Sequence, residues 1–322
     1  MLVYIMSRPH SGSTILDILL GNSRVFTGIG QLASDIHEPL NLCACGSRIQ
    51  DCTFWRSVRA RLEAQGHDWH KSSRALAEQA HIRNFLATWR AAADDPELVR
   101  LGELSRAVAQ AVVEASGKRI MLESSKEPTR GLLLMRYVPE AFLIHLVRDP
   151  RSAMASHYWR LKKGYFHFLR RDYPARPWGP LFLILAAISW IAGNLLQELV
   201  VRRDPSRVLR IRYEDLRRRP AEEIGRIAVT LGVDLADVVE TLARGQALAR
   251  SHIIGGNEVR LEKDLRFDPE KQSRRPPLPR WVTAMTVLFC WPLMLRYGYL
   301  RHDAEPPSSS ADASRPQLGT PR

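Results

Sequence analysis

The chain begins with a short apolar segment that leads directly into a loop rich in serine. Residues 2–6 (LVYIM) predict a buried strand, and residues 7–14 (SRPHSGST) predict the loop. Residues 14–22 predict a helix, because their apolar side chains recur at helical spacing. This order points the backbone N–H groups of a helix N-terminus at one spot, where an anion is stabilised. The chain is therefore restricted to folds with a phosphate-loop-like turn after a buried strand.

Strands and helices are expected to alternate along the rest of the chain. The apolar patterns predict strands over residues 118–122, 142–147 and 207–212, and helices over 53–65, 76–91, 98–115, 180–202, 219–231, 235–245 and 278–297. This alternation predicts an α/β fold in which a parallel sheet carries helices on both faces. Among 322 residues no clear linker precedes Asp303, so we expect one domain over residues 1–302 and a disordered Pro/Ser-rich tail over 303–322.

The loop offers several groups that suit a phosphate. Gly12 lets the backbone approach an anion closely. The remaining groups are donors and cations, namely Arg8, His10, Ser11, Ser13 and Thr14. In the nucleotide-kinase phosphate loop, G-x-x-x-x-G-K-[ST], the lysine falls on Ser13 of this chain. That difference disfavours a magnesium–nucleotide site built around a lysine.

A second basic motif, VRDPRSAMAS, follows the strand predicted over residues 142–147. Arg148 stands at the carboxyl end of that strand, where open α/β sheets bind ligands. Ser156 lies eight residues further on, about two helical turns away, and can share a face with the start of the helix. Together the two residues are suited to hold a second phosphate.

The two motifs together resemble the phosphosulfate-binding signatures of the sulfotransferase family. That resemblance implies a P-loop NTPase-like α/β fold and the cosubstrate PAPS (3′-phosphoadenosine 5′-phosphosulfate). The first motif would hold the 5′-phosphosulfate, and Arg148 and Ser156 the 3′-phosphate. The implied reaction is in-line transfer of a sulfuryl group to a hydroxyl or amine of an unidentified lipid, glycan or small metabolite. It requires no metal.

Later segments extend the resemblance to the family. IRYEDL resembles the segment whose tyrosine, here Tyr213, lies near the nucleotide, and HIIGGNEVR resembles the loop that closes over it, with Asn257 and Arg260. ESSKEP resembles a segment after the second core strand and places Lys126 at the acceptor or the sulfate oxygens. CACG…CTFW and the closing RYGY are similar to a bacterial branch of the family.

Two positions depart from the family pattern. His10 stands where Lys or Arg usually neutralises the leaving phosphate; a nearby phosphosulfate would favour its charged form, or Arg8 takes over this role. Gln31 stands where related branches carry a catalytic Glu, and an amide cannot accept the proton, so Gln31 is expected to orient the acceptor. The remaining candidates for the base are Asp35, His37, Glu38 and Glu123. A small-molecule kinase with a degenerate phosphate loop, or a non-catalytic nucleotide-binding relic, is the alternative function.

Three cysteines, Cys43, Cys45 and Cys52, lie within ten residues of one another. They could form a metal clip with a fourth ligand such as His37, because zinc takes four ligands. Half-buried structural thiols are the alternative interpretation, and the spacing alone favours it.

The net charge of +13 favours a polyanionic partner, although a solvated basic surface gives the same sum. A cosubstrate with three anionic groups accounts for the basic surplus, and no nucleic-acid-binding motif is recognisable.

Residues 181–193 predict a core helix, whereas residues 281–295 predict either a core helix, which we favour, or peripheral contact with a membrane. The expected location is the cytoplasm, with membrane association as an option.

Overall fold

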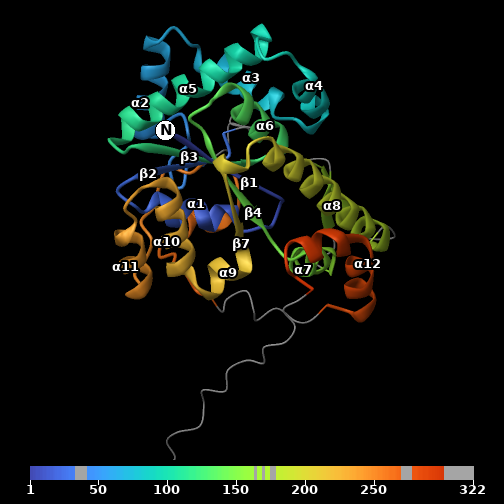
Figure 1. The fold of residues 1–322 in the computed structure, drawn as a ribbon. Helices are drawn as coiled ribbons and strands as arrows, with labels where there is room; N and C mark the ends of the chain where they lie inside the picture. Colours follow the sequence, from blue (N-terminus) through green and yellow to red (C-terminus); the bar gives the residue numbers. More distant parts are fainter. Residues whose placement is uncertain (33–41, 163–164, 169–170, 175–178, 270–277, 301–322) are drawn as a thin grey trace, which may run out of the picture.

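The computed structural model describes residues 1–32, 42–162, 165–168, 171–174, 179–269 and 278–300. Its centre is a five-stranded parallel sheet with the strand order β2-β3-β1-β4-β7 (Figure 1). The strands are β1 (Leu2–Ser7), β2 (Phe26–Gly30), β3 (Ile120–Lys126), β4 (Phe142–Val147) and β7 (Val208–Arg212). The predicted α/β class is confirmed.

Helices cover both faces of the sheet (Figure 1). One face carries α2 (Thr53–Ala64), α3 (Trp69–Gln79), α4 (Phe85–Arg90), α5 (Pro96–Ser116) and α6 (Pro128–Tyr137). The other carries α1 (Ser13–Gly21), α9 (Tyr213–Arg218), α10 (Pro220–Leu231) and α11 (Ala236–Ala243). A third group beside the sheet comprises α7 (Pro150–Lys162), α8 (Gly179–Arg203) and α12 (Arg280–Arg296), and the short strands β5 (Tyr165–Phe168) and β6 (Arg171–Pro174) form a hairpin after α7.

Strand β1 is buried on both faces. Tyr4 and Met6 pack into the cluster beneath α2–α6, whereas Val3 and Ile5 pack into the cluster beneath α1 and α10. Successive side chains of a strand point to opposite faces, so an unbroken apolar run is what a central strand requires. The first strand of the chain therefore occupies the middle of the sheet.

Several predicted elements differ from the observed ones. The helix predicted over 76–91 is interrupted between α3 and α4, where the Asn84 side chain donates to the backbone oxygen of Glu78 (2.8 Å). Strand β2 was not predicted, because two of the five residues in FTGIG are glycine, which is rare in strands. Strand β3 runs to Lys126, so the ESSK segment belongs to the strand rather than following it. The tail at 303–322 lies outside the described residues, and the single-domain interpretation remains a prediction.

The core-helix prediction for residues 181–193 is correct for one face of α8 only. Leu183 and Trp190 are buried, but Leu185 and Ile188 are exposed. Helix α12, which covers residues 281–295, is likewise apolar and exposed along one side, where Leu288 is 70% exposed. Helix α8 is the one described helix with the length and apolarity to cross a membrane, and about a third (33%) of its most apolar window is buried.

A buried ion pair ties β3 to α6. Arg130 and Glu123 are both fully buried, and their closest nitrogen and oxygen atoms lie 2.9 Å apart. Arg130 also donates to the Ser105 hydroxyl (2.7 Å) and Glu123 accepts from the Ser125 hydroxyl (2.7 Å), so both charges have further polar partners. Removing one partner would leave the other charge buried and uncompensated, which is costly.

We expect Arg130→Met to lower the free energy of unfolding by about 3–5 kcal/mol, because the Glu123 carboxylate loses its counter-charge. The measurement is urea denaturation followed by circular dichroism. The control is Arg74→Met, which removes an exposed pair with Glu78 and should cost less than about 1 kcal/mol. The double variant Glu123→Gln/Arg130→Met should recover part of the loss; a loss as large as that of Arg130→Met would contradict the charge argument.

Candidate active site

A cavity of about 700 Å³ opens at the carboxyl edge of the sheet, beside the ends of β1 and β4. It brings together side chains from segments that lie far apart in the sequence. Among the residues singled out from the sequence, its lining includes His10, Gly12, Ser13, Thr14, Gln31, Lys126, Arg148, Ser156, Tyr213 and Asn257.

The loop between β1 and α1 forms the floor of this cavity. Gly12 precedes the first residue of α1 with a left-handed backbone (φ 87°), and the hydroxyl-bearing residues Ser13 and Thr14 are buried in the first turn of α1. A Cβ atom at Gly12 would lie 2.1 Å from Cε2 of Tyr213, so only glycine fits beneath that ring. The N-terminal N–H groups of α1 therefore face the cavity at close range and favour an anion there.

Arg148 and Ser156 lie on the other side of the cavity. Both are buried, and Arg148 stands between β4 and α7, the helix that carries Ser156. The Arg148 guanidinium donates to the carbonyl oxygen of His10 and lies over the Tyr213 ring, 4.9 Å from its centroid. These contacts hold the cation in place beside the loop, as a second anion position requires.

Gln31 and Lys126 meet at the third side of the cavity. The side-chain amide of Gln31 is oriented so that its oxygen faces two donors. It accepts a hydrogen bond from Lys126 Nζ (2.5 Å) and one from the backbone N–H of Gly256 (3.3 Å). Burial lowers the pKa of Lys126 to about 8, although the nearby carboxylates of Glu127 and Asp17 oppose this shift. The ammonium ion is thus the main form at neutral pH.

Backbone strain is concentrated at the same cavity. Among the described residues other than glycine, only His10 (φ 66°) and Lys126 (φ 77°) have a left-handed backbone. This conformation costs roughly 1–2 kcal/mol for such residues, and it persists where the surrounding structure enforces it. Both strained residues line the cavity, which is typical of functional sites.

The segment after His252 closes the cavity. The backbone N–H of Ile254 donates to the oxygen of Ile29 (3.0 Å), and the Gln31 N–H donates to the oxygen of Ile254 (2.8 Å). The N–H of Asn257 donates to Thr14 Oγ1 (3.2 Å), so this segment bonds directly to the first turn of α1. The segment therefore lies beside β2, on the outer side of the sheet, and reaches the cavity from there.

Three residues expected to bind the nucleotide do not line the cavity. Arg8 is directed toward α8, where it donates to the Ser189 hydroxyl (2.8 Å), so it is not placed to take over the role of His10. Ser11 is buried within the loop. Arg260 folds back on its own segment and onto the backbone oxygen of Leu42 (3.3 Å).

The acids near the cavity have distinct environments. Glu123 is held by Arg130 in the buried pair and is therefore not available as a base. Asp17 is fully buried, and this burial raises its pKa to about 7; it accepts from the Ser124 hydroxyl (2.5 Å) and the Gly30 N–H (3.1 Å). The other candidates for the base, Asp35, His37 and Glu38, lie outside the described residues.

The cavity also contains residues that the sequence did not single out. Leu265 and Phe267 give it an apolar wall, whereas Glu262, Arg266 and Asp268 give it a charged rim. No motif marks this stretch, and it becomes part of the site only because the segment after Asn257 turns back over α1.

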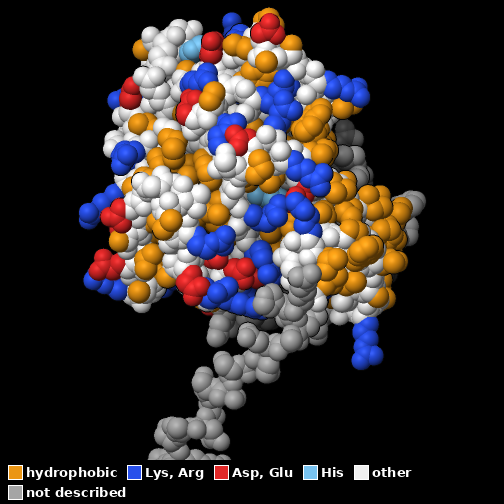
Figure 2. Space-filling model, viewed as in Figure 1, with side chains coloured by type: hydrophobic (Ala, Val, Ile, Leu, Met, Phe, Trp, Pro, Cys, Tyr) orange, Lys and Arg blue, Asp and Glu red, His pale blue; other side chains and the backbone are white. Residues whose placement is uncertain are grey.

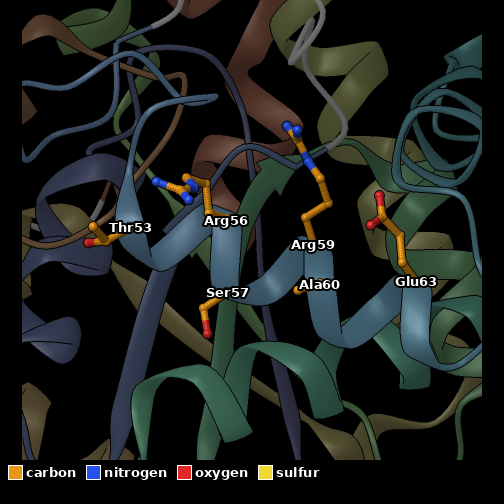
Figure 3. Close-up of a pocket in the computed structure, with 6 residues that line it drawn as sticks. All are labelled: Thr53, Arg56, Ser57, Arg59, Ala60 and Glu63. Carbon is orange, nitrogen blue, oxygen red and sulfur yellow. The ribbon is translucent and has the colours of Figure 1, made fainter.

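A second depression, of about 540 Å³, lies along α2 and has no comparable chemistry. Figure 3 shows that its lining residues all belong to this helix and that Ser57 points away from Arg56 and Arg59. Side chains that diverge from one helix cannot surround a ligand. The cavity beside the β1–α1 loop is therefore the candidate active site.

Comparison with known proteins assigns the chain to a family. The sequence profile of the sulfotransferase family matches residues 3–237, which include the β1–α1 loop, Arg148, Ser156 and Tyr213. The chain belongs to the sulfotransferase family. No curated protein matches its sequence.

Among solved structures, the chain is similar to the sulfotransferase domain from the curacin biosynthetic pathway, with 19% identity, a TM-score of 0.48, and coverage of 90% of this chain and 96% of that one. It is similar to the sulfotransferase domain of the Synechococcus PCC 7002 olefin synthase, with 21% identity, a TM-score of 0.48, and 91% and 94% coverage. It is also similar to sulfotransferase STF9 from Mycobacterium avium, with 15% identity, a TM-score of 0.46, and 91% and 76% coverage.

We expect Gly12→Ala to destabilise the chain more than Gly66→Ala. Both glycines have a left-handed backbone, which costs about 1–2 kcal/mol for alanine, but only Gly12 has a ring in the path of the added Cβ atom. Nothing lies within 4 Å of a Cβ atom at Gly66. The measurement is the free energy of unfolding in urea. Equal losses for the two variants would show that Tyr213 moves aside without cost.

Proposed function

We propose that this sulfotransferase uses PAPS and transfers its sulfuryl group to a hydroxyl or amine of an acceptor molecule. The observation that carries this proposal is the convergence of two anion positions in one cavity. The N-terminus of α1 supports the first position, and Arg148 with Ser156 supports the second. The apolar wall formed by Leu265 and Phe267 suits a nucleobase ring.

The proposed reaction is an in-line displacement at sulfur. The acceptor oxygen or nitrogen forms a bond to sulfur while the bond to the bridging phosphate oxygen breaks, and the acceptor proton leaves to a base or to water. Adenosine 3′,5′-bisphosphate is the second product. By analogy with phosphoryl transfer, positioning and fixed charge supply most of the acceleration.

His10 and Lys126 are proposed to provide that fixed charge. His10 lies on the β1–α1 loop, and since Arg8 is directed toward α8, His10 is the basic side chain of this loop that lines the cavity. It is assigned to the leaving bridging oxygen. Lys126, held against the Gln31 amide, is assigned to the sulfate oxygens, and Gln31 to the acceptor hydroxyl. No step requires a metal ion.

We expect Arg148→Ala to weaken binding of adenosine 3′,5′-bisphosphate by roughly 10- to 150-fold, because a charge-assisted hydrogen bond is worth about 1.5–3 kcal/mol. Isothermal calorimetry without Mg²⁺ measures this, and the exposed Arg218→Ala is the matched control. Unchanged affinity in Arg148→Ala would contradict the assignment. Binding of Mg-ATP alone would instead support the kinase alternative, and bisphosphate binding without turnover of PAPS on any acceptor would support a non-catalytic relic.

We also propose that the protein works at the cytoplasmic face of an anionic membrane. The contact is assigned to the α8–α12 apolar surface, defined by the exposed side chains of Leu181, Leu185, Ile188, Trp281, Leu288, Phe289, Trp291 and Leu295. Figure 2 shows hydrophobic side chains gathered over the part of the molecule where α8 and α12 lie in Figure 1. Two half-exposed tryptophans and an exposed Arg280 beside them suit a headgroup boundary.

The packing of α8 agrees better with contact on the membrane surface than with a position of this helix across the membrane. Gln197 on the inner face of α8 donates to the backbone oxygen of Ser7 (2.6 Å), and Glu198 pairs with Arg210 and Arg296. Moving α8 into a bilayer would break these buried polar contacts, and each such group is costly to leave unpaired.

We expect Leu288→Asp/Trp291→Asp to abolish co-sedimentation with phosphatidylglycerol-containing vesicles while leaving bisphosphate binding intact. A charge on this face opposes entry of the apolar side chains into the lipid. The control is Val229→Asp, which changes an apolar residue on α10 that is more exposed (84%) than Leu288 and Trp291. If the wild-type chain does not co-sediment, or if the double variant still does, the membrane assignment is wrong.

A further inference from the structure

Three cysteines and one histidine bring their ligating atoms to one point beside α2. The Sγ atoms of Cys43, Cys45 and Cys52 and a ring nitrogen of His252 all lie within 4.8 Å of one another. Sγ of Cys45 and Sγ of Cys52 are 3.7 Å apart. Nδ1 of His252 is 3.3 Å from Sγ of Cys52 and 3.6 Å from Sγ of Cys43.

The separations of 3.3, 3.6 and 3.7 Å lie close to the edges of a zinc tetrahedron. With Zn–S bonds of about 2.3 Å and a Zn–N bond of about 2.0 Å, tetrahedral geometry places two sulfurs about 3.8 Å apart and a sulfur and a nitrogen about 3.5 Å apart. A disulfide is a poor description, because its sulfurs would be about 2.05 Å apart. All four cysteines of the chain are free thiols.

The loop before α2 presents the three thiols in one direction. The backbone N–H of Cys43 donates to the oxygen of Ser47 (2.9 Å), and that of Gly46 donates to the oxygen of Cys43 (2.9 Å), so the chain turns back on itself between Cys43 and Ser47. Cys52 immediately precedes α2, and its N–H donates to the oxygen of Arg48 (2.9 Å). These backbone hydrogen bonds bring the three sulfurs close together.

His252 reaches this loop from a segment 200 residues away. The Phe54 ring stacks on its imidazole, with the centroids 4.6 Å apart and the planes 11° from parallel. Trp55 Nε1 donates to the backbone oxygen of His252 (2.9 Å), and the Ala44 N–H donates to the oxygen of Ile253 (3.0 Å). The imidazole is therefore held with Nδ1 toward the sulfurs.

We propose that Cys43, Cys45, Cys52 and His252 bind one zinc ion as a structural site. Four protein ligands leave no open position for substrate, which is the mark of a structural rather than a catalytic zinc. The chemistry of the set also favours zinc, because three soft thiolates and one imidazole in a tetrahedron suit this ion better than magnesium or calcium.

The proposed ion connects two walls of the molecule. It would tie the loop before α2 to the segment that continues from His252 to Gly256 and Asn257 at the candidate active site. Any effect of the ion on nucleotide binding rests on the proposed function, whereas the metal site itself does not depend on that function. Zinc content and bisphosphate affinity are therefore measured separately, and the failure of one does not imply the failure of the other.

The test starts with the full chain, purified without an affinity tag after growth in zinc-supplemented medium. Plasma mass spectrometry after dialysis should give one zinc per chain. Cys45→Ser, which changes the least buried of the three thiols, and His252→Ala should each lose most of the zinc. The matched control is Cys290→Ala, because Cys290 lies in a separate cluster beside Ala187 and should retain the full zinc content.

Replacement by Co²⁺ provides a readout that does not depend on the variants folding. The wild-type chain should show the strong visible absorption of a tetrahedral cobalt ion and thiolate-to-cobalt charge transfer in the near ultraviolet. Cys290→Ala should show the same spectrum. Wild-type chain with far less than one zinc and no such cobalt spectrum overturns the proposal, as does full zinc retention in folded His252→Ala and Cys45→Ser.

Discussion

The burial of β1 on both faces is the constraint on which the rest of the site depends. Because β1 stands in the middle of the sheet, the loop that follows it opens at the carboxyl edge between β3 and β4. Parallel strands end at the same edge, so Lys126 from β3 and Arg148 from β4 are brought to either side of that loop. The N-terminus of α1 then adds its dipole at the same point. One apolar strand thus positions three separate sources of positive potential.

The late segment from His252 to Asn257 completes the site from outside the sheet. It lies against β2 through backbone hydrogen bonds at Ile29 and Gln31, and a Cβ atom at Gly30 would lie 2.1 Å from the oxygen of Ile254. Such close approach of two backbones is possible only at glycine. At one end this segment meets the three cysteines, and at the other it bonds to Thr14 in the first turn of α1. A metal at the first end would therefore stabilise the wall at the second.

Helix α8 has one face buried against the rest of the molecule and one face exposed. Its inner face carries Gln197 and Glu198 into a buried polar network with His145 and Arg210, whereas its outer face is apolar and exposed. A buried His145 in this network has a pKa lowered to about 3 by desolvation and the nearby Arg210, so it is neutral. Buried polar and apolar side chains on the inner face hold the helix to the rest of the molecule. The exposed apolar face is the one proposed to contact a lipid surface.

Local sequence was sufficient for the features that depend on neighbours in the chain. The strand–loop–helix opening, the strand before Arg148 and the helix that carries Ser156 follow from apolar periodicity and motif spacing, and the structure confirms them. The resemblance to the sulfotransferase family also implied one site for Gly12, Thr14, Arg148 and Tyr213, and all four line the cavity. The family profile, which matches residues 3–237, confirms the membership.

Only the tertiary structure decided which side chains enter the site and which partners they meet. Arg8 follows directly after β1 yet is directed toward α8, and no local pattern reports the direction of a side chain at a loop. Glu123 is a candidate base by its position in the sequence, but its buried ion pair with Arg130 removes it from that role. His252, rather than a residue near the cysteines, meets the three thiols, because the segment that carries it packs against β2. Contacts across 200 residues arise from the packing of the whole sheet, and the one-dimensional spacing of residues does not contain them.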